Sequence, residues 1–171
     1  MIIGIDVSTS KIGWAVIDES KKLIDSGVFK TNKKHGLEEK ASDFLDSVLL
    51  PLKALYPKSE VRIEAPFSMF SGGKTTAKTM SSLQRFNGMI SLLVYQTFEK
   101  SAELVAPISA RSRCGIKVPR GTKAKVVVME WVDKTFENFE MEYTKAGNPK
   151  PGKDDEADAI IVALSHFDVR K

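Results

Sequence analysis

The stretch that decides the fold is residues 2–30, which read IIGIDVSTSKIGWAVIDESKKLIDSGVFK. It contains three apolar, β-branched runs, at 2–7, 11–18 and 23–30, separated by turn-forming residues at 8–10 and 19–22. Short runs with turn residues between them are typical of strands in an antiparallel meander. The chain is therefore predicted to open with three antiparallel strands, and the first of them carries an acidic residue, Asp6, near its end.

The rest of the chain predicts an alternation of helices and strands. Apolar residues recur every three or four positions over 37–55, which predicts a helix, and further helices are predicted over 76–98, 122–136 and 154–169. Extended runs at 61–64 and 104–108 predict two more strands, and 138–153 is predicted to be a loop or irregular hairpin. This order predicts one α/β domain over 1–171, with a mixed five-stranded sheet, antiparallel at first and then parallel, flanked by helices.

Charge is divided unevenly along the chain. The 171 residues include 26 Lys and Arg against 22 Asp and Glu, a net charge of +4. The segment 65–129 holds ten basic and two acidic residues, so it carries +8, and the other 16 basic and 20 acidic residues give −4. A basic segment between acidic flanks suggests a polyanionic partner, and a solvated lysine-rich face is the alternative explanation.

The composition excludes several classes of protein. Hydrophobic residues make up 42% of the chain and charged residues 28%, which is typical of a soluble globular protein and too apolar for a disordered one. No apolar run approaches the roughly 20 residues of a spanning helix, and no basic region precedes the first strand, so a cytoplasmic location is expected. The single Cys114 has no partner for an internal disulfide or a zinc site.

Four acidic residues lie where strand ends and a helix start could bring them together. Asp6 and Glu64 each lie at the end of a predicted strand, and Asp155 and Asp158 are three apart on one face of the last predicted helix. Each has an ordinary explanation, such as a turn at Asp6, a pair between Glu64 and Arg62, or helix-dipole stabilisation of the aspartates. Together they favour a two-metal phosphodiesterase site, because Mg²⁺ bound by carboxylate oxygens would offset their mutual repulsion.

Basic residues after the fourth predicted strand are the candidates for binding nucleic acid. Six of them fall within the fifteen positions 111–125, without one acid, and phosphate binding is the favoured interpretation. The basic residues predicted to contact DNA are Lys74, Lys78, Arg85, Arg111, Arg113, Lys117, Arg120, Lys123 and Lys125. The stretch Gly72-Gly73-Lys74 lacks the spacing of a Walker motif, so no nucleotide cofactor is expected.

The acids and their neighbours resemble the four-carboxylate pattern of the RuvC Holliday-junction resolvases, members of the RNase H-like superfamily. The matching stretches, in order and at similar spacing over most of the chain, are Gly4-Ile5-Asp6, Gly13 to Ile17, Ile63-Glu64 and Asp155 to Ala159. The resemblance implies an RNase H-like fold and a homodimer that cleaves four-way DNA junctions. It also implies that the four acids bind two Mg²⁺ ions in each active site, with Mn²⁺ as an alternative metal.

The resemblance implies roles for other residues as well. It places an aromatic wedge for the junction at Phe67 and a lysine near the scissile phosphate at Lys123. Leu83-Gln84-Arg85 with Gly88 resembles the long-helix motif that builds much of the family's dimer interface, and His166 takes the family's position eight residues after the last aspartate.

The chain departs from the family after its first aspartate. Val7-Ser8-Thr9-Ser10 stands where bacterial RuvC proteins usually have proline and glycine. This difference leaves the carboxylates intact and suggests a phage-type or otherwise divergent member, which would act in the host cytoplasm if phage-encoded.

Three other functions fit part of the sequence. A ribonuclease H-type enzyme acting on RNA–DNA hybrids would use similar acids, but the paired aspartates and the long helix over 76–98 favour the resolvase. The hairpin at 4–10 also resembles the phosphate-binding hairpin of actin-like ATPases and sugar kinases, which need a second similar domain that 171 residues do not provide. A non-catalytic DNA-binding module is the third, and the full set of acids disfavours it.

Overall fold

The computed structural model describes residues 1–66 and 76–170. Its five strands are β1 (Ile2–Val7), β2 (Lys11–Ile17), β3 (Leu23–Lys30), β4 (Glu60–Glu64) and β5 (Glu103–Val105). They form one sheet in the order β3-β2-β1-β4-β5, in which β1, β2 and β3 pair antiparallel and β1, β4 and β5 pair parallel. The predicted mixed five-stranded sheet is confirmed.

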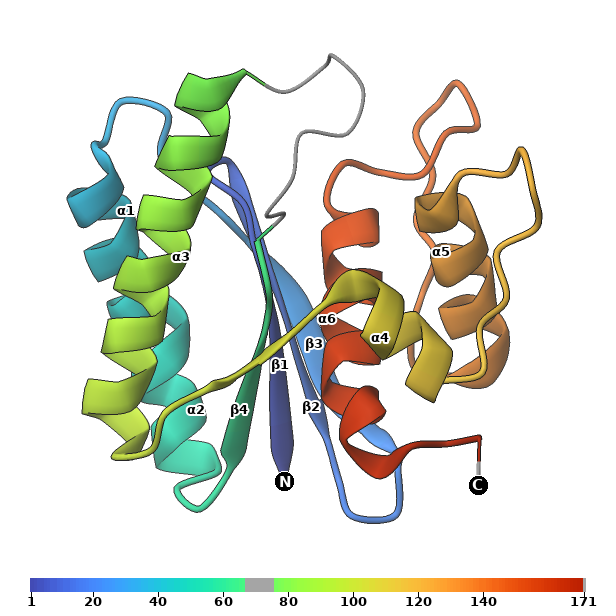
Figure 1. Cartoon of the computed structure of the whole chain (residues 1–171), viewed down its shortest axis with the longest axis horizontal. Coiled ribbons are helices and arrows are strands. Elements are labelled where there is room, and N and C mark those ends of the chain that lie inside the picture. The colour runs from blue at the N-terminus through green and yellow to red at the C-terminus, as the bar shows by residue number, and fades with distance from the viewer. Residues whose placement is uncertain (67–75, 171) are drawn as a thin grey trace.

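Helices cover both faces of the sheet (Figure 1). One face carries α1 (Leu37–Phe44), α2 (Leu50–Leu55) and α3 (Ala77–Phe98), and the other carries α4 (Pro107–Arg113), α5 (Ala124–Thr135) and α6 (Lys153–Leu164). Each layer of helices encloses its own hydrophobic core against the sheet. Among the helices of the described residues, none is both long and apolar enough to cross a bilayer.

The alternation of side chains along β1 and β4 decides which layer each residue joins. Ile3 and Ile5 of β1 and Ile63 of β4 belong to the core beneath α1 and α3. Because successive residues of a strand point to opposite faces, Asp6 and Glu64 point to the other face, the one covered by α6. The two strand-end carboxylates are thus directed into the same layer.

Helix α6 approaches the sheet closely because two glycines leave room for it. A Cβ on Gly4 of β1 would lie 2.1 Å from the carbonyl oxygen of Ala159, and a Cβ on Gly13 of β2 would lie 2.0 Å from that of Asp155. Neither position has space for a side chain. The first two turns of α6, with Asp155 and Asp158, therefore lie directly over β1 and the start of β2.

The predicted helix over 37–55 and strand over 104–108 are both wrong in part. A π-helical turn, Leu45–Leu49, separates α1 from α2, and Pro51 in the first turn of α2 has no N–H for a regular hydrogen bond. The predicted strand ends at Val105, because Pro107 favours the first position of a helix and α4 begins there. This short helix offers too few apolar repeats for its periodicity to be recognised.

The last predicted helix, 154–169, is shorter than expected. Helix α6 ends at Leu164 and is followed by a 3₁₀ turn, Ser165–Phe167. The remaining predicted helices, over 76–98 and 122–136, are confirmed to within two residues as α3 and α5.

Candidate active site

A pocket of about 290 Å³ lies at the carboxyl ends of β1 and β4. It is lined by the four acids singled out in the sequence, namely Asp6, Glu64, Asp155 and Asp158. The two strands are parallel neighbours, so they end at the same edge of the sheet, and α6 begins beside that edge. Topology thus brings together residues that are up to about 150 positions apart in the sequence.

The acids are close enough to affect one another's ionisation. Burial, reinforced by the charges of Glu64, Asp158 and Asp155, raises the pKa of Asp6 well above its usual value. Burial, together with the charge of Asp158, raises the pKa of Glu64 to about 8, and burial raises the pKa of Asp158 to about 6. Ionising all four side chains is therefore unfavourable in the protein alone, and a bound cation would relieve that cost.

The donor set fits a hard divalent cation, because Mg²⁺ and Mn²⁺ prefer carboxylate oxygens. Within residues 1–66 and 76–170, however, no three acidic, histidine or cysteine side chains converge tightly enough to hold one ion. The chemistry and the common location of the acids thus suit metal binding, whereas their side chains are not gathered around a single point.

Two lysines and one arginine bring positive charge to the acids. Lys125, in the first turn of α5, lines the pocket and donates a hydrogen bond from Nζ to Oδ2 of Asp154 at 2.8 Å. Lys11, at the start of β2, lies with Nζ 3.5 Å from Oδ2 of Asp155. Arg111 of α4 also lines the pocket, and its charge lowers the pKa of Glu64 against the effect of burial.

No sequence pattern singles out Lys11, and for Lys125 and Arg111 the sequence predicts only contacts with the DNA backbone. Lys11 is remote from the acids of α6 in sequence, and only the packing of that helix against β2 brings it to Asp155. For Arg111 the missed signal was Pro107, which begins the helix that carries the arginine to the pocket.

The structure places Lys123 differently from Lys125. Lys123 is the exposed N-cap residue of α5 and is not among the residues that line the pocket, whereas Lys125 is. The role near the scissile phosphate that the resemblance implies for Lys123 therefore stays a prediction, whereas the lysine that the structure brings to the pocket is Lys125.

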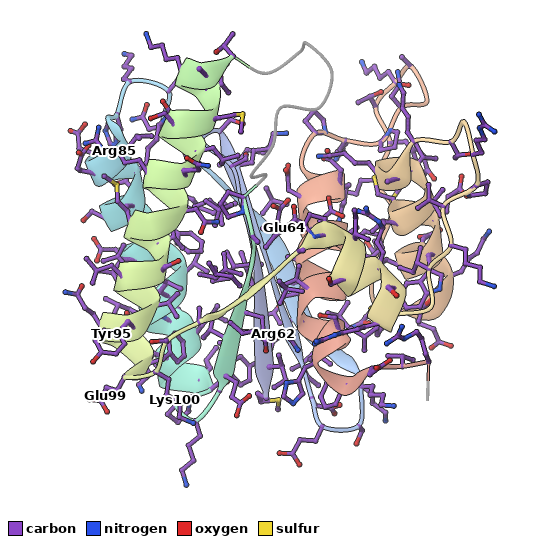
Figure 2. The ribbon with its side chains drawn as sticks, in the orientation of Figure 1. Arg62, Glu64, Arg85, Tyr95, Glu99 and Lys100 are labelled. Atoms are coloured by element: carbon purple, nitrogen blue, oxygen red, sulfur yellow. The ribbon has the colours of Figure 1, made fainter. Side chains whose placement is uncertain are left out.

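The other predicted DNA contacts lie on two sides of the pocket. Lys78 and Arg85 belong to α3, and Arg85, labelled in Figure 2, forms an ion pair with Glu38 of α1. Across the pocket, α4 carries Arg113 in addition to Arg111, and the segment between α4 and α5 carries Lys117 and Arg120. Phe67 and Lys74 lie outside the described residues.

His166 does not join the acids. Its Nδ1 lies 3.8 Å from Oε2 of Glu60, which begins β4, whereas Glu64 ends the same strand. The histidine is therefore at the opposite end of the strand from the pocket.

Comparisons with known proteins agree with this architecture at the level of fold. No family model matches the chain, and the curated proteins include none with significant sequence similarity to it. Among solved structures, T. thermophilus RuvC in complex with a Holliday junction substrate superposes with a TM-score of 0.68 at 18% identity, over 99% of this chain and 93% of that chain. The yeast mitochondrial Holliday junction resolvase Ydc2 gives a TM-score of 0.59 at 20% identity, over 98% of this chain and 77% of that chain. The chain therefore has the RNase H-like fold of the RuvC-type resolvases.

Proposed function

We propose that this protein is an endonuclease that hydrolyses phosphodiester bonds in four-way and other branched DNA, using two bound Mg²⁺ or Mn²⁺ ions. The observation that carries the proposal is the meeting of Asp6, Glu64, Asp155 and Asp158 in one pocket whose wall also includes Arg111 and Lys125. The fold shared with T. thermophilus RuvC, which was solved with a Holliday junction substrate, supports branched DNA as the substrate.

The four acids would hold the cations at the carboxyl ends of β1 and β4. Asp6, Asp155 and Asp158 are buried and Glu64 is half-buried, so their positions are fixed by the sheet and by α6. Two divalent cations bound there would activate a water molecule and stabilise the leaving oxygen of an in-line displacement.

Arg111 and Lys125 would bind the scissile phosphate. Both line the pocket, and Lys125 is held in place by its hydrogen bond to Asp154. Donors fixed in this way stabilise negative charge that develops on phosphate oxygens, and they need little reorganisation during the reaction. Lys117, Arg120 and Lys123, on the adjoining segment, would contact neighbouring phosphates in a salt-dependent manner.

The protein would act as a homodimer through the outer surface of α3. Leu92 and Tyr95, three residues apart on this helix, are 56% and 54% exposed, and Figure 2 shows Tyr95 on the side of α3 that faces away from the sheet. Neighbouring exposed apolar side chains of this size favour an interface with another protein surface. Two sites related by a twofold axis would account for paired, symmetric incisions in a four-way junction.

The proposal is tested by incubating end-labelled four-way junction, flap, duplex and RNA–DNA hybrid substrates with and without Mg²⁺ and mapping every nick. We expect paired nicks at symmetric positions in the junction, only when the metal is present. Asp6→Asn and Glu64→Gln should abolish the nicks, and Asp133→Asn, which changes an exposed acid of α5, should not. Cleavage by Asp6→Asn at the parental rate would contradict the assignment, and cleavage confined to the hybrid would favour a ribonuclease H-type enzyme.

A further inference from the structure

Two consecutive aspartates in the first turn of α6 each pair with a lysine from a different element. Asp154 accepts a hydrogen bond from Lys125 of α5 at 2.8 Å, and Asp155 lies 3.5 Å from the ammonium group of Lys11 in β2. Each of the two aspartates thus has a positively charged side chain beside it.

Close packing fixes the position of Lys11. Gly13, two residues along β2, allows the backbone of Asp155 to approach the strand. Gly152, the N-cap residue of α6, lets the start of the helix pack against β3, since a Cβ at position 152 would lie 2.9 Å from Val28. The Cδ of Lys11 would lie 3.4 Å from the same Cβ, an ordinary contact distance. The side chain of Lys11 is only 27% exposed. Its ammonium group is therefore directed at Asp155 by its surroundings.

The two lysines differ in whether their acidic partner is a proposed metal ligand. Asp154, the partner of Lys125, does not line the pocket and is not one of the four proposed metal ligands, so Lys125 can keep its partner. Asp155 is a proposed ligand, and a divalent cation on its carboxylate would lie close to the ammonium group of Lys11. The divalent cation and the Lys11 ammonium group, both bound to the same carboxylate, would repel each other even where solvent weakens the interaction.

We propose that Lys11 is the counter-ion of Asp155 in the metal-free protein and that a divalent cation displaces it from this carboxylate. Lys11 thereby lowers the affinity of the site for metal. The inference rests on the metal site of the proposed function and deepens it.

The test is a titration with Mn²⁺ alone, without DNA, followed by electron paramagnetic resonance of the free ion. Lys11→Gln should bind Mn²⁺ about tenfold more tightly than the parent, because both the competing ammonium group and its charge are removed. Lys11→Arg, which keeps the charge, should stay close to the parent. Lys30→Gln is the matched control, because exposed Lys30 lies opposite Lys11 in the β2–β3 ladder, and it should change the affinity by less than about twofold.

A second measurement keeps the test decisive if Lys11→Gln folds less well. Mn²⁺ should raise the Tm of Lys11→Gln by more than it raises the Tm of the parent, since tighter binding to the folded state stabilises it further. The inference is overturned if Lys11→Gln binds Mn²⁺ no more tightly than Lys30→Gln does, or more weakly than the parent. Either result would leave the metal site itself in place. A parent protein that binds no Mn²⁺ contradicts the proposed function itself.

Discussion

Gly13 of β2 lies against the backbone of Asp155 in α6, so closely that a Cβ at position 13 would be 2.0 Å from the Asp155 carbonyl oxygen. This contact sets the height of the first turn of α6 above the sheet. The carboxylates of Asp155 and Asp158 therefore reach the ends of β1 and β4 only because β2 has no side chain at this point.

Gly13→Ala should displace the first turn of α6 from the pocket and destabilise the protein. The added methyl group meets backbone atoms that cannot move without shifting the helix, so we expect a loss of at least about 2 kcal/mol in the free energy of unfolding, measured with urea. Gly36→Ala is the control, because its Cβ would have no contact shorter than 3.6 Å and should cost less than about 1 kcal/mol. Equal stability of the two variants would contradict the close approach.

The metal-free protein should become less stable as the pH rises from about 5 to 8. The pKa of Glu64 is raised from its ordinary value of 4.5 to about 8, and that of Asp158 from 3.8 to about 6. Between the ordinary and the raised values the folded protein binds more protons than the unfolded chain, so its free energy of unfolding falls as the pH rises.

This pH dependence can be measured from urea midpoints in the presence of a chelator. Glu64→Gln should reduce the difference between pH 5 and pH 8, whereas Glu19→Gln, at an exposed turn residue, should keep it. Excess Mg²⁺ at pH 8 should restore stability, because it binds the ionised carboxylates of the folded state. A midpoint that rises steadily with pH in the chelated protein would show that the acids are not buried as described.

Lys125→Gln should slow the cleavage of a four-way junction at saturating DNA by at least about tenfold, since the ammonium group lines the pocket. Lys123→Gln should instead weaken DNA binding and reduce its salt dependence, with little change in the rate at saturation, because Lys123 is exposed outside the pocket. Single-turnover kinetics separates the two effects. The reverse pattern would restore to Lys123 the role that the family resemblance implies.

Removing the partner of Arg62 should cost more stability than removing Arg62 itself. Arg62 of β4, labelled in Figure 2, is 2% exposed, and its Nη2 donates to Oε1 of Glu103 at 2.6 Å. Glu103→Ala leaves a buried cation with no strong acceptor and should cost about 2 kcal/mol, whereas Arg62→Met replaces it with an apolar side chain of similar length and should cost less than about 1 kcal/mol. Urea unfolding of the two variants measures the difference, and a larger cost for Arg62→Met would contradict this explanation.

Tyr95→Glu should convert the proposed homodimer to a monomer in sedimentation equilibrium, because a charge would be buried in the apolar contact between two α3 helices. Ile24→Glu is the comparison, since Ile24 is also an exposed apolar residue, on the edge strand β3, and it should leave the dimer intact. Two monomeric variants, or a parent that is already monomeric, would exclude the α3 interface.

Much of the fold could be predicted from local patterns. The three opening strands are short apolar, β-branched runs between turn residues, and helix α3 has apolar residues every three or four positions. The type and bounds of these elements are therefore predicted to within about two residues. The break at Leu45–Leu49 is not predicted, because the apolar period continues across it to Pro51 in α2. The helix α4, which begins at Pro107, is too short to show a period. Where the local pattern is weak, the packing around a segment decides its secondary structure.

The sequence alone was enough to pick out the four acids and to predict that they meet, because they lie at the ends of predicted strands and near the start of a predicted helix. Tertiary packing decided which positively charged side chains lie beside these acids. Gly13 lets α6 approach β2 until Lys11 reaches Asp155, and α5 brings Lys125 rather than Lys123 to the pocket. A periodic pattern records which face of an element is buried, whereas the contact of two side chains from distant elements depends on how closely their backbones pack.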